Sequence, residues 1–333
     1  MQTKIVSIEQ GLDEAAELIK NGDIVVFPTE TVYGLGANAF DGNAVRKIFE
    51  AKGRPMDNPL IAHIADISWI DKLAVDVSDS AKAVIKAFMP GPITVILKRS
   101  KAVPDEVTAG LDTVGIRFPK HNVARQFIKA CGVPLAAPSA NTSTKISPTS
   151  AQHVFEDMKG RIPLILQGGE CEVGIESTIV DMTVDVPTIL RPGAITADML
   201  VKVLDKVKNF DGNIIVAKAP GMKYKHYAPS CEMVVASSED KAIFEYGRQV
   251  GLQHNPVIIA KNDYVPDQIL LNSIRLNVIR LGATDEEAMR NIYAAMHEAQ
   301  DKYDYIICQD FGDEGLGASI MNRINKASGG KRI

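Results

Sequence analysis

The stretch "KIVSIEQGLDEAAELIKNGDIVVFP", residues 4–28, decides the fold class because it contains a strand, a helix and a second strand in succession. "KIVSI" alternates as a strand does, and "EQGLDEAAELIKNG" has a helical period that ends at Asn21-Gly22, a pair that stops helices. "DIVVFP" is a continuous apolar run, which is typical of a buried strand. Similar strand–helix units follow, and this alternation predicts an α/β protein.

The chain is expected to contain two domains joined by a linker. Residues 1–207 hold most of the strand–helix units and end in the helical stretch 196–204. The sequence pattern then changes. Residues 208–230 show no clean periodicity towards their end and carry two prolines, which is typical of a linker. Strand–helix alternation returns over residues 231–333 and predicts a smaller second α/β domain.

Composition excludes several classes of protein. The 333 residues include 46% hydrophobic and 23% charged residues, and the net charge of −4 gives no overall attraction for nucleic acid or anionic membrane. The four cysteines are far apart, so we expect reduced thiols in a cytoplasmic protein rather than a zinc or redox motif. No apolar run approaches the length of a membrane span, and the N-terminal stretch lacks the apolar core of a signal peptide.

Two motifs near the N-terminus favour an anionic ligand. "PTETVYGLG", residues 28–36, follows a strand directly and would present hydroxyls and flexible backbone at a sheet edge. "KGRP", residues 52–55, ends an amphipathic helix with Lys52 and Arg54, shortly before "NPL". Each motif has an ordinary structural alternative: a turn rich in glycine and threonine, and cations that match the negative end of a helix.

Further cations and hydroxyls favour the ligand-binding alternative. Arg117 lies in the apolar strand "VGIRFP" and needs a partner, because an unpaired buried charge is very costly. Arg191 ends the strand "TILRPG", while "APSANTS" and "GIESTIVD" supply hydroxyls. Such a set suits a phosphate chain and a carboxylate. No activated nucleophile and no metal-binding spacing stands out, so the chemistry would rely on positioning and charge.

Eight motifs, taken in their order along the chain, resemble those of the YrdC-like family, and in particular those of its two-domain threonylcarbamoyladenylate synthases. They are "PTETVYGLG", "KGRP" with "NPL", "PGPIT", "VGIRFP", "PSAN", "STIVD", "LRPG" and "PGMKYKHYAP". The strong resemblance covers residues 5–205, and eight ordered motifs are far more specific than any one of them. It implies a twisted mixed sheet with helices and a concave basic site, followed by a smaller Rossmann-like α/β domain.

The resemblance also implies site residues. The family's K-x-R and S-x-N quartet falls on Lys52, Arg54, Ser139 and Asn141. The residues implied for threonine are Thr31, His63, Arg117, Ala137 and Ser177. Those implied for the nucleotide are Arg54, Asn58, Thr113, Ser139, Ser147, Arg191 and Tyr227. Arg117 would pair the threonine carboxylate in a bidentate fork, and Tyr227, in the linker, would close over the site as a lid.

The reaction implied is the formation of threonylcarbamoyl-AMP and pyrophosphate from L-threonine, bicarbonate and ATP, the first step of threonylcarbamoyladenosine modification of tRNA next to the anticodon. Mg²⁺ would enter with ATP, and no metal held by the protein alone is expected. Transient contact with tRNA or with the complex that transfers the threonylcarbamoyl group is a further expectation. The alternatives are a nucleic-acid-binding module, a carbamoyl-adenylate domain of the hydrogenase-maturation type, and a sensor that binds nucleotide or threonine without turnover.

Overall fold

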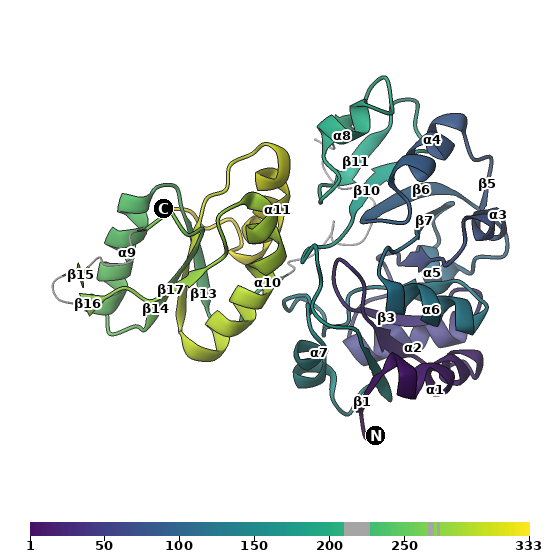
Figure 1. Cartoon of the computed structure of the whole chain (residues 1–333), viewed down its shortest axis with the longest axis horizontal. Helices are drawn as coiled ribbons and strands as arrows, with labels where there is room; N and C mark the ends of the chain where they lie inside the picture. The colour runs from purple at the N-terminus through teal and green to yellow at the C-terminus, as the bar shows by residue number, and fades with distance from the viewer. Residues whose placement is uncertain (210–226, 266–269, 272–273) are drawn as a thin grey trace. The chain divides into compact units, whose positions relative to one another are not determined.

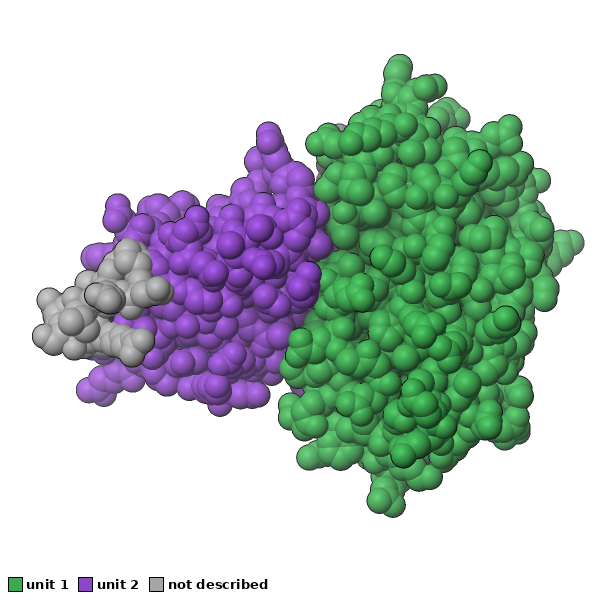
Figure 2. All heavy atoms as spheres, in the orientation of Figure 1, with its two compact units in different colours: residues 1–143, 148–224 green, residues 144–147, 225–333 purple. Residues whose placement is uncertain are grey.

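The computed structural model describes residues 1–209, 227–265, 270–271 and 274–333. The chain divides into two compact units, coloured separately in Figure 2: residues 1–143 with 148–224, and residues 144–147 with 225–333. The linker expected at residues 208–230 lies for the most part outside the described residues, so its boundaries stay a prediction. In the described ranges, no helix combines the length and the apolar character needed to cross a membrane.

The first unit is built on one large mixed sheet (Figure 1). Its strands are β1 (Lys4–Ser7), β2 (Val25–Phe27), β3 (Gly34–Asn38), β4 (Ile61–His63), β5 (Ala74–Val75), β6 (Ile93–Arg99), β7 (Thr113–Arg117), β8 (Leu135–Ala137), β9 (Leu164–Gln167), β10 (Thr178–Asp181), β11 (Thr188–Arg191) and β12 (Lys208–Asn209). Their order is β1-β9-β2-β3-β8-β4-β7-β6-β10-β11-β12, with β5 paired to β6. The sheet contains both parallel pairs, such as β4–β7, and antiparallel pairs, such as β6–β7, which confirms the predicted mixed sheet.

Helices cover both faces of this sheet. They are α1 (Ile8–Lys20), α2 (Gly42–Lys52), the 3₁₀ turn η1 (Ile67–Trp69), α3 (Ile70–Leu73), α4 (Asp79–Phe88), α5 (Asp105–Thr108), α6 (Asn122–Cys131), α7 (Ala151–Met158) and α8 (Ala197–Val201). Val25 and Phe27 of β2 pack with α1 and α6, whereas Val26 packs in the core that includes α2, α4 and α7. Alternate residues of a strand point to opposite faces, so the unbroken apolar run in β2 follows from burial on both sides.

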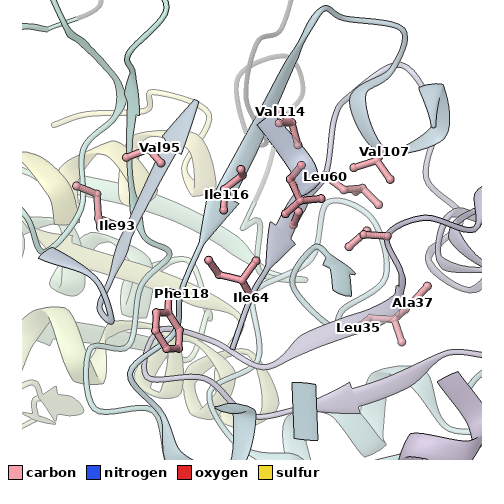
Figure 3. Close-up of a cluster of buried hydrophobic side chains, with 14 of the residues drawn as sticks. Leu35, Ala37, Leu60, Ile64, Ile93, Val95, Val107, Val114, Ile116 and Phe118 are labelled. Atoms are coloured by element: carbon pink, nitrogen blue, oxygen red, sulfur yellow. The ribbon is translucent and has the colours of Figure 1, made fainter. Parts of the chain in front are cut away.

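The larger core lies where the central strands meet (Figure 3). Side chains of β3, β4, β6 and β7 gather there, and Leu35, Ile93, Val95 and Ile116 are each fully buried. Such a core makes the ends of these strands a rigid support for polar side chains.

The position expected for the glycines of the "PTETVYGLG" motif was wrong. Gly34 and Gly36 of "PTETVYGLG" do not lie in a loop at a sheet edge but in β3, between β2 and β8. The ring of Phe27 explains the glycines, because a Cβ added at Gly36 would lie 2.8 Å from Phe27 Cε1. The glycines therefore serve the close packing of an internal strand.

The second unit has the predicted Rossmann-like architecture. Its elements are β13 (Glu232–Ala236), α9 (Glu239–Gly251), β14 (Pro256–Ala260), β15 (Leu270–Leu271), β16 (Ile274–Arg275), β17 (Val278–Arg280), α10 (Asp285–Lys302), β18 (Tyr305–Gln309) and α11 (Gly315–Ala327). Strands β13-β18-β14-β17 form an all-parallel sheet, with α9 on one side and α10 and α11 on the other (Figure 1). Thr284 and Glu287 form a capping box that starts α10. The short β15–β16 hairpin was not predicted.

Candidate functional site

Lys52 lies at the end of α2 and contacts the "PSAN" segment. Asp41 caps the start of this helix, and Gly53, with φ of 60°, ends it. The Lys52 side chain is buried, and its Nζ donates to the backbone oxygens of Ser139, at 2.6 Å, and of Asn141. The K-x-R and S-x-N motifs, far apart in sequence, therefore meet in the fold.

The environment of Lys52 disfavours its charge. Burial holds the pKa of the ammonium well below its usual value, and the positive charge of Arg54 lowers it further, whereas Asp157 acts in the opposite direction. Asp157 of α7 also accepts hydrogen bonds from the backbone N–H of Thr142, at 2.6 Å, and from its hydroxyl, at 2.8 Å. The segment after "PSAN" is thus fixed on two sides, by Lys52 and by Asp157.

Arg54 shapes the turn that follows α2. Its Nη2 donates to the backbone oxygen of Asn58 at 3.0 Å, and its guanidinium lies 5.8 Å from the centre of the Phe49 ring. The Asn58 side chain is only 1% exposed, and within the described residues neither its Oδ1 nor its Nδ2 has a hydrogen-bond partner. A buried amide without partners is unusual, which makes Asn58 a candidate for contact with a ligand.

Arg117 ends β7 and is buried in a network with the "PTET" residues. Its Nη2 lies 2.8 Å from Glu30 Oε1, an ion pair in which both side chains are at most 5% exposed, although the two atoms lack the alignment of a hydrogen bond. Its Nη1 donates to Thr31 Oγ1 at 2.8 Å. The Thr29 and Thr31 hydroxyls are 2.9 Å apart. The partner that the sequence required for Arg117 is therefore Glu30, a residue that the sequence analysis did not single out.

His63 ends β4 and lies opposite Arg117 in the parallel pairing of β4 with β7. Its ring stands edge-on to Phe27, and its Nδ1 lies 3.1 Å from the backbone oxygen of Ile61. Burial, and secondly the charge of Arg117, lowers the pKa of His63 to about 3. The imidazole is therefore neutral near neutral pH and suits ligand contact or packing rather than proton uptake.

Ser177 and Arg191 meet at the ends of β10 and β11. Arg191 Nε donates to the Ser177 backbone oxygen at 3.0 Å, and its Nη2 donates to Ser177 Oγ at 3.2 Å. Ser177 Oγ lies 2.8 Å from Thr94 Oγ1, which comes from the "PGPIT" motif. A Cβ added at Gly193 would lie 2.5 Å from the backbone nitrogen of Thr178, so the "LRPG" glycine allows a close approach of two chain segments.

The remaining predicted residues are more scattered. Ala137 is buried in β8, and Thr113 is half-buried at the start of β7. Ser147 and Tyr227 are buried and belong to the second unit.

Three partners of the predicted residues were not themselves predicted: Thr29, Glu30 and Asp157. The "PTET" motif was a signal for Thr29 and Glu30, whereas nothing in the sequence pointed to Asp157.

Among the described residues, no group of three or more histidine, cysteine, aspartate or glutamate side chains is placed to hold a metal ion. The site of the first unit instead offers guanidinium groups, hydroxyls, an unpartnered amide and a neutral histidine. This set fits a carboxylate and a phosphate chain together with small polar groups.

Comparison with known proteins shows the family. The model of the Sua5, YciO and YrdC proteins, described as "Telomere recombination", matches residues 17–193. The chain belongs to this family. A second model, described as "Threonylcarbamoyl-AMP synthase, C-terminal domain", matches residues 195–329. The resemblance drawn from the motifs is thereby confirmed, and the first model spans all the predicted site residues except Tyr227.

Family members with similar sequences span the whole chain. The chain is 42% identical to the threonylcarbamoyl-AMP synthase of Pyrococcus abyssi, with 98% of each chain covered, and 42% identical to that of Bacillus subtilis, with 96% and 93% covered. The crystal structure of Pyrococcus abyssi Sua5 complexed with L-threonine matches at a TM-score of 0.91 and 41% identity over 100% of this chain and 98% of that one. E. coli YciO, at a TM-score of 0.51 and 24% identity over 58% of this chain and 95% of its own, is similar in fold.

Proposed function

We propose that this chain is a threonylcarbamoyl-AMP synthase that uses L-threonine, bicarbonate and ATP and releases pyrophosphate. The observation that carries the proposal is the coincidence of two results. Relatives named for this activity match the chain from end to end, and the motif residues Lys52, Ser139 and Asn141 meet in the fold. The relative crystallised with L-threonine, at a TM-score of 0.91, supports threonine as the amino acid.

In the proposed reaction the threonine amine and bicarbonate first give a carbamate, with loss of water. A carbamate oxygen then attacks the α-phosphorus of ATP, and the bond to the bridging oxygen breaks as pyrophosphate leaves. No covalent bond to the enzyme forms, so the protein contributes positioning and charge. Mg²⁺ enters with ATP in this proposal and neutralises the charge of the leaving group.

The threonine pocket is proposed around Arg117. The guanidinium binds the threonine carboxylate, while Thr31, His63 and Ser177 line the pocket and Ala137 limits its size. Two observations support this: Arg117 is already held by Glu30 and Thr31, and its Nε is buried with no hydrogen-bond partner in the described parts of the chain. A guanidinium fixed in this way loses little freedom when it binds a carboxylate.

The nucleotide side is proposed around the quartet. Lys52 and Arg54 contact phosphate and carbamate oxygens in this proposal. Asn58, Thr113, Ser139, Ser147 and Arg191 complete the nucleotide contacts, and Tyr227 covers the site. The buried, unpartnered amide of Asn58 supports its part in this assignment. Lys52, whose ammonium already donates to two backbone oxygens, also fixes the position of Ser139 and Asn141.

We further propose that the product serves threonylcarbamoyladenosine modification of tRNA next to the anticodon, through a separate transfer complex, in the cytoplasm. A reactive mixed anhydride needs such an acceptor step, because it hydrolyses when it is left in water. Transient contact with tRNA or with that complex belongs to this proposal.

The test is pyrophosphate release from ATP by the purified full-length chain with Mg²⁺, leaving out threonine or bicarbonate in turn. The proposal expects release only when both are present. Release without either would indicate a plain nucleotide hydrolase. An absence of release, with threonine still bound, would indicate a sensor and overturn the proposal.

A further inference from the structure

The backbone of the first unit holds Glu30 in place beside Arg117. In the bend at "PTET", the Thr29 hydroxyl accepts from the backbone N–H groups of Thr31 and Val32, both at 3.2 Å. The same hydroxyl donates to the Val32 oxygen at 2.6 Å. The backbone N–H of Val173, from the loop after β9, donates to the Glu30 backbone oxygen at 2.7 Å. The main chain therefore fixes the position of the Glu30 carboxylate.

The ion pair between Glu30 and Arg117 leaves polar atoms without hydrogen bonds. Nη2 of Arg117 lies 2.8 Å from Oε1 of Glu30, yet both carboxylate oxygens and the arginine Nε are buried without a hydrogen-bond partner within the described residues. A buried ion pair stabilises a fold only when its remaining donors and acceptors are satisfied, because its desolvation is costly. A ligand with a cationic and an anionic group would supply a donor for Glu30 and an acceptor for Arg117.

Arg117 and Glu30 together carry no net charge, and two neighbouring ionisable side chains add none. His63 is neutral near neutral pH, because burial and secondly the charge of Arg117 lower its pKa to about 3. Burial, and secondly the negative charge of Glu30, raises the pKa of the Cys171 thiol, so this group stays protonated. A simple carboxylate would bring an uncompensated negative charge into this buried site, which is costly. The zwitterion of an amino acid would bring none.

We propose that Glu30 makes the pocket prefer the zwitterion of an α-amino acid over the same acid without its amino group. Arg117 binds the carboxylate, and the negative charge of Glu30 attracts the ammonium. These two groups of the ligand are attached to one carbon, so a carboxylate at Arg117 brings the ammonium close to the partner of that guanidinium. The inference rests on the proposed function, and it concerns the capture of threonine, which precedes carbamate formation.

The test is titration calorimetry of the full-length chain without ATP, with L-threonine and with (R)-3-hydroxybutyrate, which is the same acid without the amino group. Glu30→Gln keeps the shape of the side chain and removes its charge, whereas Glu30→Asp keeps the charge. Asp76→Asn is the control, because it removes a carboxylate from an exposed ion pair with Lys98 in the same unit.

Glu30→Gln changes the net charge of the pocket from zero to one positive charge. We therefore expect it to bind threonine about tenfold more weakly and (R)-3-hydroxybutyrate about tenfold more tightly than wild type. Glu30→Asp and Asp76→Asn should keep the ratio of the two affinities near that of wild type. The ratio is decisive, because a purely structural defect weakens the binding of both ligands.

Equal weakening of both ligands in Glu30→Gln would overturn the inference and leave Glu30 only the role of holding Arg117. Wild type itself tests the inference in case the glutamine variant does not fold: equal affinities of wild type for the two ligands would also overturn it. Pyrophosphate release decides the proposed function separately. A chain that prefers threonine in the way described but releases no pyrophosphate would support the role of Glu30 and reject the proposed reaction.

Discussion

Lowering the pH from neutral should destabilise the first unit through His63, whose ring is buried beside Phe27 and opposite Arg117. Burial lowers the pKa of this histidine from 6.5 to about 3. Between these values the unfolded chain binds a proton that the folded chain does not bind, so stability rises with pH across the window. The stability that depends on neutral His63 is therefore fully present above pH 6.5 and is lost as the pH falls towards 3.

The size of the effect follows from the pKa difference. Each pKa unit corresponds to about 1.4 kcal/mol, so the free energy of unfolding should fall by up to about 1.4 kcal/mol for each pH unit below 6.5 through this group alone. His63→Asn isolates the effect, because asparagine has an N–H that can donate to the Ile61 oxygen but no site that titrates. The free energy of unfolding of the variant should be lower than that of wild type at neutral pH, because asparagine packs less well. It should also fall less steeply as the pH is lowered.

Urea unfolding at a series of pH values, followed by tryptophan fluorescence, measures this slope. The chain has one tryptophan, Trp69, which lies in η1 of the first unit and packs against its hydrophobic core. His254→Asn, in the second unit, is the control and should leave the acid slope of the Trp69 transition unchanged. If the free energy of unfolding falls equally steeply with decreasing pH in wild type and in His63→Asn, the reasoning is refuted.

Three further substitutions test other parts of the account. Asn58→Leu should leave the Trp69 transition unchanged or raise the free energy of unfolding by up to about 1 kcal/mol, because it removes a buried amide that has no partner within the described residues, while KM for ATP rises. Arg117→Lys keeps a charge beside Glu30 but loses the guanidinium fork, so KM for threonine should rise about tenfold or more with little change for ATP. Asp41→Ala should lower the free energy of unfolding by about 1 kcal/mol, because its carboxylate caps α2.

Each of these expectations has a contradicting outcome. A clearly destabilised Asn58→Leu would mean that the amide serves the fold rather than a ligand. Equal increases in both KM values for Arg117→Lys would place Arg117 outside the threonine pocket. An Asp41→Ala variant with an unchanged Trp69 transition would mean that the start of α2 does not limit the stability of this unit.

Local signals in the sequence predicted much of the fold. The helical period that ends at Asn21-Gly22 indicated α1, and the apolar run of β2 indicated a buried strand, as observed. The strand order could not be read from the sequence, because β9 inserts between β1 and β2 from more than a hundred residues away. The glycines of β3 misled for a related reason, since their cause is the ring of Phe27 on the neighbouring strand.

The candidate site shows the same limit. The motifs named Lys52, Ser139 and Arg117, but the contacts that hold these side chains join residues about 90 positions apart in the sequence. Glu30 was overlooked because it follows β2 whereas Arg117 ends β7, and nothing in the sequence shows that these two segments meet. The roles assigned by resemblance, the concave basic site and the lid role of Tyr227 stay predictions.

The central claim is that a carbamate of threonine, and not threonine itself, is joined to AMP. The most direct measurement incubates the chain with ATP, Mg²⁺, L-threonine and ¹³C-bicarbonate and determines the mass of the adenylate product. The account predicts an adenylate that contains threonine and the heavy carbon. An adenylate of threonine without that carbon, formed equally well when bicarbonate is left out, would contradict it.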